Sequence, residues 1–171
     1  MSTAVEVLGR FRELAPVDRR ELVGLWRGSG VPTGHPLDGV LENLGWFGKR
    51  FHPNFRADAL LFQIGPGRLV AVEPAHIPMG LALRLGSMGR TRMARHCFAY
   101  LQRLLRARGP TATIEMQDFE GINSAAMVYD RQPITDLFRR IDDVRLLGMM
   151  SYQHDPRPYF FTLVRQEYSP I

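Results

Sequence analysis

The chain has 171 residues, of which 45% are hydrophobic and 23% are charged. This is the make-up of a globular protein with a sizeable core, and it excludes a largely disordered or fibrous chain. The single cysteine, Cys97, excludes an internal disulfide and a multi-cysteine metal site, and we expect it to be a small buried apolar group.

The formal net charge is +5, with Lys49 as the only lysine, so arginine carries nearly all of the positive charge. Residues 74–114 contain no acidic side chain. An arginine patch of this kind could meet an anionic ligand, a membrane surface or nucleic acid. The arginines of this stretch are Arg84, Arg90, Arg92, Arg95, Arg103, Arg106 and Arg108.

The N-terminus lacks the pattern of a signal sequence, and no apolar run reaches about 18 residues. We therefore expect no export and no membrane span, and a cytoplasmic protein. We predict one domain, 1–171, made of four parts. They are an N-terminal helical segment (1–21), a first half rich in glycine and tryptophan (22–75), a basic helical insertion (76–110) and a C-terminal β half (111–171).

In the first half of the chain, residues 2–15 place Val5, Leu8, Phe11 and Leu14 on one apolar stripe, which predicts a helix. Asp18 can cap a short turn after it. The elements that follow alternate with turn signals. They are a strand at 22–31, a short helix or wide turn at 35–43, and strands at 46–51, 59–64 and 68–73.

In the second half, residues 93–106 change to a helical period. We expect the face formed by Ala94, Cys97, Phe98 and Leu101 to pack on the rest of the protein and the arginines to face water. The remaining predictions are strands at 111–119 and 122–129, a short helix over 133–141, and strands at 144–152 and 159–165.

About eight short strands with hairpin-like spacing predict a mainly β fold. A closed antiparallel barrel is favoured over an open sheet, because an open sheet leaves edges that need cover. We therefore predict an antiparallel β-barrel of about eight strands, with an N-terminal helix and one or two additional helices.

Two groups of motifs carry a resemblance to a known family. The first comprises 24–28 (Gly-Leu-Trp-Arg-Gly), 32–39 and 45–51, and these resemble the family named for its G-x-W-x-G motif. The second comprises 129–139, 147–148 and 159–161, and these look like the domain of unknown function that follows it. The resemblance implies a lipocalin-like barrel, in which Trp26 caps one end and a late arginine, Arg165, stacks over it. It implies very little about activity.

Four residues are candidates for acid–base chemistry: His35, Asp38, Lys49 and Tyr129. His35 and Asp38 are three apart, so one could orient the other as a general base, or both could cap a turn. Lys49 could be a desolvated amine or an anion clamp, although a solvated strand lysine is the simplest interpretation. Tyr129 and Asp130 alternate along a strand and point to opposite faces unless a bulge intervenes.

Large aromatic side chains and seven methionines could line a ligand pocket or simply fill the core. We predict an internal pocket that combines these groups with the few polar ones, including Asp130. Its candidate ligand-binding residues are Trp46, Phe47, Phe51, Phe62, Asp130 and Phe161. The histidines show no metal spacing, and no single one stands out as a haem ligand, so we predict no metal and no cofactor.

Two functions remain open at this point. The first is binding of a small hydrophobic or amphipathic molecule inside the barrel, with the basic stretch near the entrance. The second is a cofactor-independent isomerase, cyclase or lyase acting on a lipophilic substrate. We expect no nucleic-acid partner, whereas the arginine-rich helix could touch an anionic membrane surface. The sequence leaves the ligand, the reaction and the oligomeric state open.

Overall fold

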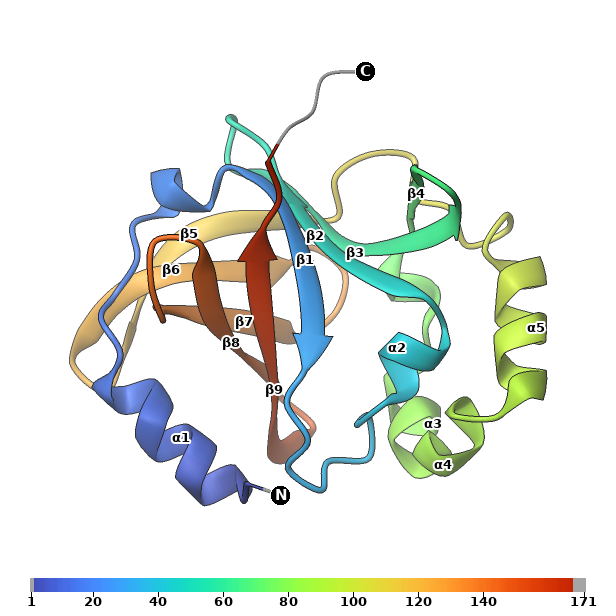
Figure 1. The fold of residues 1–171 in the computed structure, drawn as a ribbon, viewed down its shortest axis with the longest axis horizontal. Helices are drawn as coiled ribbons and strands as arrows, with labels where there is room; N and C mark the ends of the chain where they lie inside the picture. The colour runs from blue at the N-terminus through green and yellow to red at the C-terminus, as the bar shows by residue number, and fades with distance from the viewer. Residues whose placement is uncertain (1, 168–171) are drawn as a thin grey trace.

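A closed antiparallel β-barrel forms the main body of the protein, as described by a computed structural model over residues 2–167 (Figure 1). This confirms the predicted mainly β class. Eight strands close the barrel, and a ninth, β4 (Arg68–Ala71), extends the sheet beside β3. The barrel strands are β1 (Gly24–Gly30), β2 (Trp46–Phe51), β3 (Arg56–Gly65), β5 (Ala112–Phe119), β6 (Ile122–Tyr129), β7 (Ile134–Arg140), β8 (Arg145–Tyr152) and β9 (Asp155–Arg165).

The two halves of the barrel meet at two junctions of unequal length. Strands β1 and β9 pair from Trp26↔Arg165 to Gly30↔Phe161. Strands β3 and β5 pair only through Arg56↔Thr113 and Ala57↔Ala112. Further along, β3 pairs with β4 from Leu61↔Ala71 onward, so β3 and β5 separate after two residue pairs. The chain between these two strands carries the helical insertion.

One end of the barrel is closed by the segment before β1. Asp18 caps the short helix η1 (Arg19–Leu22), as expected from the sequence. The guanidinium of Arg165 lies 4.3 Å from the centroid of the Trp26 ring and donates a 2.9 Å hydrogen bond to the carbonyl of Val23. The predicted pairing of tryptophan and arginine on the first and last strands is therefore confirmed.

The opposite end is covered by α2 (Val40–Asn43), η2 (Pro74–His76), α3 (Met79–Arg84) and α4 (Gly86–Gly89) (Figure 1). These elements pack Leu41, Met79 and Leu83 against the main core, to which Leu37 of the loop before α2 also belongs. The backbone of α4 lies so close to the loop before α2 that a Cβ on Gly86 would be 2.1 Å from the carbonyl oxygen of Pro36. Glycine is therefore required at this contact.

The helix α1 (Ala4–Glu13) lies across the outer face of the barrel, where Val7 and Phe11 pack on Leu137, Leu147 and Phe160. Strand β7 is consequently buried on both faces. The prediction of a helix over 133–141 was wrong for this reason. Apolar side chains on both faces of one strand produced a spacing that resembles a helical stripe.

The helix α5 (Arg92–Leu101) is shorter than the helix predicted over 93–106. It docks through Phe98, whose ring centroid is 4.7 Å from that of Phe62. Cys97 and Leu101 are exposed, which corrects the expectation that both are buried under the helix. No helix in the described part of the chain is long and apolar enough to span a membrane.

Candidate functional site

A buried ion pair crosses the interior of the barrel from β2 to β7. The ammonium nitrogen of Lys49 lies 2.8 Å from Oδ2 of Asp136, and these side chains are 3% and 1% exposed. Lys49 also donates to the carbonyl of Ala59 at 3.0 Å and to the hydroxyl of Tyr129 at 3.4 Å. Tyr129 in turn donates to Oδ2 of Asp136 at 3.3 Å. Lys49, Tyr129 and Asp136 therefore form one hydrogen-bonded cluster, here called the interior cluster.

The strand register explains how these side chains meet. Directly paired residues of neighbouring strands point to the same face of a sheet. Lys49 pairs with Trp26, and Asp136 lies in a row with Met127, Met150 and Tyr159 across β6 to β9. In the order β1-β2-β3-β5-β6-β7-β8-β9, strands β2 and β7 stand on opposite sides. The ion pair thus spans the width of the barrel.

Aromatic rings surround the lysine. Its ammonium nitrogen is 5.0 Å from the centroid of Phe161, 5.7 Å from that of Tyr129 and 5.8 Å from that of Trp46. Distances of this size allow cation–π attraction in a desolvated setting. The simplest sequence interpretation, a solvated strand lysine, was wrong, since Lys49 is 2% exposed.

Two of these rings occupy space left by glycines in the neighbouring strands. A Cβ on Gly28 would lie 2.2 Å from the ring of Trp46, and one on Gly148 would lie 2.3 Å from the ring of Phe161. The rings therefore rest against bare backbone, and both belong to the main core cluster together with Phe51 and Phe62. The predicted aromatic lining is in the interior, with these rings packed into it.

Burial changes the acidity of the interior groups. Loss of water raises the pKa of Asp136, against the opposing effect of the Lys49 ammonium. Burial also raises the pKa of the Tyr129 hydroxyl well above its usual value, with the neighbouring carboxylate adding to the effect. Tyr129 is therefore a neutral hydrogen-bond donor to the carboxylate of the Lys49–Asp136 ion pair.

Two buried oxygens in this interior make no hydrogen bond to any described residue. They are Oδ1 of Asp136 and the hydroxyl of Tyr159. Tyr159 stacks on Phe161 with ring centroids 6.2 Å apart, and burial raises the pKa of its hydroxyl. Buried polar atoms are nearly always satisfied in proteins, so these two are the positions where a polar partner would be stabilised.

The histidine and aspartate of the turn before α2 do not bond to each other's side chains. Oδ2 of Asp38 accepts hydrogen bonds from the N–H groups of Thr33, Gly34 and His35, at 2.8–3.0 Å. Nδ1 of His35 accepts from the N–H of Leu37 at 3.1 Å, which places the proton of the neutral ring on Nε2. Both side chains shape the turn, and a role of either in proton transfer stays a prediction.

His35 nevertheless lies beside the interior. It is 6% exposed, and its ring centroid is 5.4 Å from that of Tyr159. Burial lowers its pKa, so the neutral ring is favoured. Asp38 keeps its other carboxylate oxygen buried without a partner among the described residues.

The remaining predicted residues lie outside the interior. Asp130, predicted as a ligand-binding residue of the interior, instead forms an ion pair with Arg56 on the outer surface. Tyr129 and Asp130 therefore point to opposite faces, as the alternation of a strand predicts. Phe47 is half-buried on the outer face of β2, with the guanidinium of Arg27 5.8 Å from its ring centroid.

Tyr159 belongs to the aromatic residues expected to line the interior, whereas Asp136 was not predicted as a site residue. The misassigned helix placed Asp136 outside the barrel, although an acid between Ile134 and Phe138 in a strand would have indicated an inward carboxylate. A single lysine among aromatic residues also requires a buried counter-charge. Within residues 2–167, no three His, Cys, Asp or Glu side chains gather as a metal ion would need.

Comparison with known families assigns both halves of the chain. Residues 9–67 match the family described as GXWXG protein, and residues 110–165 match the domain of unknown function DUF4334. The first match holds β1 to β3 and the second holds β5 to β9. The insertion with η2, α3, α4 and α5 lies between them, so the two matched regions together build the barrel.

A crystal structure described only as a protein from Thermomonospora curvata has the same fold. The two sequences are 28% identical. The match covers 95% of this chain and 87% of the Thermomonospora curvata protein, with a TM-score of 0.69. No curated protein matches the chain.

Proposed function

Because this chain combines the GXWXG region and the DUF4334 region in one lipocalin-like barrel, we propose that it binds a small hydrophobic or amphipathic molecule inside that barrel. Barrels of about eight strands have an interior that suits side chains or one small ligand. Fold alone does not decide between these two uses, so the proposal depends on the chemistry of the interior.

The observation that carries the proposal is the pair of unpartnered oxygens in an aromatic interior, Oδ1 of Asp136 and the hydroxyl of Tyr159. Ligand sites are typically apolar with a few polar groups that fix orientation. A ligand hydroxyl or carbonyl could donate to the carboxylate or accept from the tyrosine. The rest of the molecule would contact Trp46 and Phe161.

Binding requires space that these two rings now occupy. Trp46 and Phe161 rest against the glycine backbone of β1 and β8, and Trp46 also donates to the carbonyl of Gly48 at 3.1 Å. We expect them to rotate when a ligand enters. The elements η2 to α4, which belong to the arginine-rich insertion, cover the adjacent end of the barrel and would form the entrance.

We do not extend the proposal to catalysis. Lys49, Asp136 and Tyr129 are donors and acceptors to one another, and no observation places a reacting group beside them. The charge pair is held in place by these contacts, and Oδ1 of Asp136 is the atom of the pair that a ligand could bond. His35 and Asp38 are likewise committed to backbone N–H groups of their turn.

The test is identification of a bound molecule. Protein purified without detergent would be analysed by native mass spectrometry and organic extraction, and the neutral dye N-phenyl-1-naphthylamine would then be displaced by lipophilic alcohols and ketones. Tyr159→Phe should weaken binding of the oxygenated compounds by several-fold while leaving their hydrocarbon analogues unchanged, since only the hydroxyl is lost.

Tyr152→Phe is the matched control, because Tyr152 lies at the end of β8 and is only half-buried. It should bind all compounds as the unmodified protein does. The proposal would be wrong if no molecule copurified, no compound displaced the dye, and the indole signal of Trp46 stayed unchanged in every titration.

A further inference from the structure

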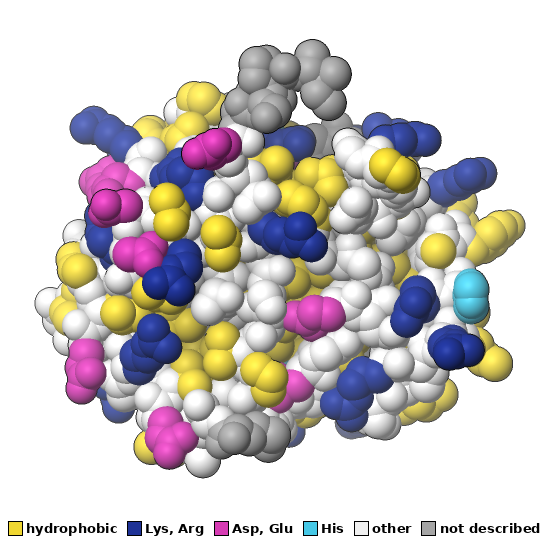
Figure 2. Space-filling view, in the orientation of Figure 1, with side chains coloured by type: hydrophobic (Ala, Val, Ile, Leu, Met, Phe, Trp, Pro, Cys, Tyr) yellow, Lys and Arg dark blue, Asp and Glu magenta, His cyan; other side chains and the backbone are white. Residues whose placement is uncertain are grey.

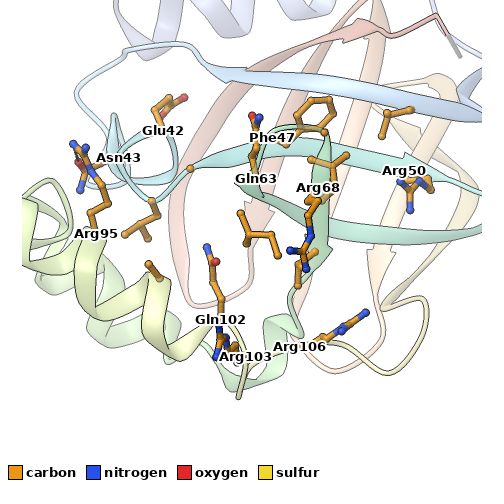
Figure 3. A pocket seen from close by; sticks show the side chains of 18 of the residues that line it. Glu42, Asn43, Phe47, Arg50, Gln63, Arg68, Arg95, Gln102, Arg103 and Arg106 are labelled. Atoms are coloured by element: carbon orange, nitrogen blue, oxygen red, sulfur yellow. Dashed lines mark hydrogen bonds between the residues drawn. The ribbon is translucent and has the colours of Figure 1, made fainter. Parts of the chain in front are cut away.

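A groove runs along the outside of the barrel, separate from the interior. It has a volume of about 1600 Å³ and lies between α5 on one side and the outward faces of β2, β3 and β4 on the other (Figure 3). Its walls combine apolar and cationic side chains. The apolar ones that matter below are Leu44, Phe47, Ile64, Val70 and Ala99.

Arginines stand along this groove with few carboxylates to neutralise them. Arg50 is 3.6 Å from Asp58, and Arg95 donates to the side chain of Asn43 at 3.1 Å. No carboxylate in the described part of the chain forms an ion pair with Arg68, Arg103 or Arg106. Figure 2 shows positive side chains on both sides of the molecule, whereas the acidic ones lie mostly over the barrel, which leaves the helical side with few acidic groups on this face.

The two acidic side chains at the groove do not cancel this charge. Glu42 is engaged by the N–H of Gly30 at 2.5 Å, at the end of the groove near Arg95. Glu167 lies near the C-terminal end of the described chain. The groove is therefore most positive beside Arg68, Arg103 and Arg106.

A buried amide provides a second, independent sign of a ligand. Gln102, which follows α5, is 6% exposed, and its side-chain amide makes no hydrogen bond within residues 2–167. Figure 3 shows this amide pointing from the helix side of the groove toward the strands that carry Gln63 and Arg68. The amide faces the groove with its donors and acceptor unused, so it is placed to bond a polar group that enters there.

We propose that this groove is a second binding site, for an acidic group carried on an apolar chain. The carboxylate or phosphate monoester would lie against Arg103 and Arg106 and accept a hydrogen bond from Gln102. The chain would run over Phe47, Ile64 and Val70. Guanidinium groups suit such oxyanions because they present several N–H donors in a plane. This site is distinct from the barrel interior and does not depend on it.

The probe is dodecyl phosphate, titrated below its micelle concentration into the full chain and followed by calorimetry and by NMR of the side-chain amides of Gln63 and Gln102. We expect binding that weakens with added salt. Dodecanol should bind less tightly because it lacks the charge. Inorganic phosphate should not bind measurably because it lacks the chain.

Two substitutions test the two halves of the groove. Arg103→Gln combined with Arg106→Gln should weaken binding about fourfold to twenty-five-fold, from a loss of about twofold to fivefold for each exposed charge. Ala99→Trp should fill the apolar part and abolish binding. Arg92→Gln is the matched control, since it lies on the same helix outside the groove. The Arg92→Gln variant should bind dodecyl phosphate with the affinity of the unmodified chain.

Several outcomes would overturn the proposal. If dodecanol bound as tightly as dodecyl phosphate, the arginines would have no role in binding. If Arg92→Gln lost as much affinity as the double variant, the effect would come from the net charge of the protein and not from the groove. Shifts at the Trp46 indole in place of the glutamine amides would place the ligand in the interior. Binding to vesicles containing phosphatidylglycerol without binding to the monomeric probe would identify a membrane surface as the partner. The groove lies outside the barrel and shares no side chain with the interior cluster, so failure of the interior proposal would not affect this one.

Discussion

Breaking the ion pair that crosses the barrel should be among the most destabilising single changes in this protein. Lys49→Met removes a charge whose partner oxygen lies 2.8 Å away, and the Asp136 side chain is only 1% exposed. Removal of one member of a buried pair typically costs about 3–5 kcal/mol of unfolding free energy, because the other charge is left in a medium of low polarity. We expect a loss in this range at pH 7.

Replacing both members gives a different result. In Lys49→Met/Asp136→Leu no charge remains to be buried, and substitution of an ion pair by apolar residues of similar volume is often neutral or stabilising. The double variant should therefore be more stable than either single variant. The difference between the double variant and the sum of the singles measures the coupling, which we expect to exceed about 2 kcal/mol.

The loss in Lys49→Met should also depend on pH. Burial raises the pKa of Asp136 and the lysine opposes that rise, so removing the lysine should raise it further. A carboxyl whose pKa is higher when folded contributes stability below its unfolded pKa and loses that contribution as the pH rises through its folded pKa. The variant should therefore be closer to the unmodified protein at pH 5 than at pH 8.

Equilibrium unfolding in urea, followed by far-ultraviolet circular dichroism at both pH values, provides these free energies. A Lys49→Met variant that lost less than about 1 kcal/mol at pH 7 would show that the pair contributes little. Additive losses in the double variant would show that the two charges act independently. Either result would refute the account of a coupled pair across the interior.

Three further changes test other parts of the structure. Arg165→Ala should lower the free energy of unfolding by about 1–2 kcal/mol, because it removes the cation–π contact with Trp26 and a hydrogen bond, and thermal unfolding would measure this. Gly148→Ala should cost about 1–3 kcal/mol, since the new methyl group would meet the Phe161 ring, and equal stability would show that the ring is free to move away. His35, whose pKa is lowered by burial from 6.5, binds its proton more readily in the unfolded chain, so stability should fall as the pH drops below about 6.5. His35→Asn keeps an acceptor for the turn and should flatten that dependence, as measured by urea unfolding between pH 5 and 8.

Local signals in the sequence were sufficient for most of the barrel. Strands at 46–51 and 122–129 were predicted with the bounds that the structure has, because each is a short run with large apolar residues between turn signals. The pairing of Trp26 with Arg165 followed from closure of the barrel, since the first and last strands must then be neighbours. These features depend on short-range patterns and on one topological rule.

The errors arose where tertiary packing decides the structure. Strand β7 is covered on one face by the core and on the other by α1, and no pattern within 133–141 indicates that second layer. The same error hid Asp136, whose position opposite Lys49 depends on the register of four strands. The exposure of Cys97 likewise reflects how α5 is docked through Phe98, which the helix period alone does not define.

The short junction between β3 and β5 has a consequence for how the barrel moves. Only two residue pairs hold β3 to β5, whereas β1 and β9 share five. Local opening of the shorter junction breaks few backbone hydrogen bonds, so its free energy should be lower than that of the longer one. Amide protons near Ala57 and Thr113 should exchange with solvent sooner than those near Gly28 and Leu163. Such opening gives the interior a lateral route to solvent while both ends of the barrel stay closed.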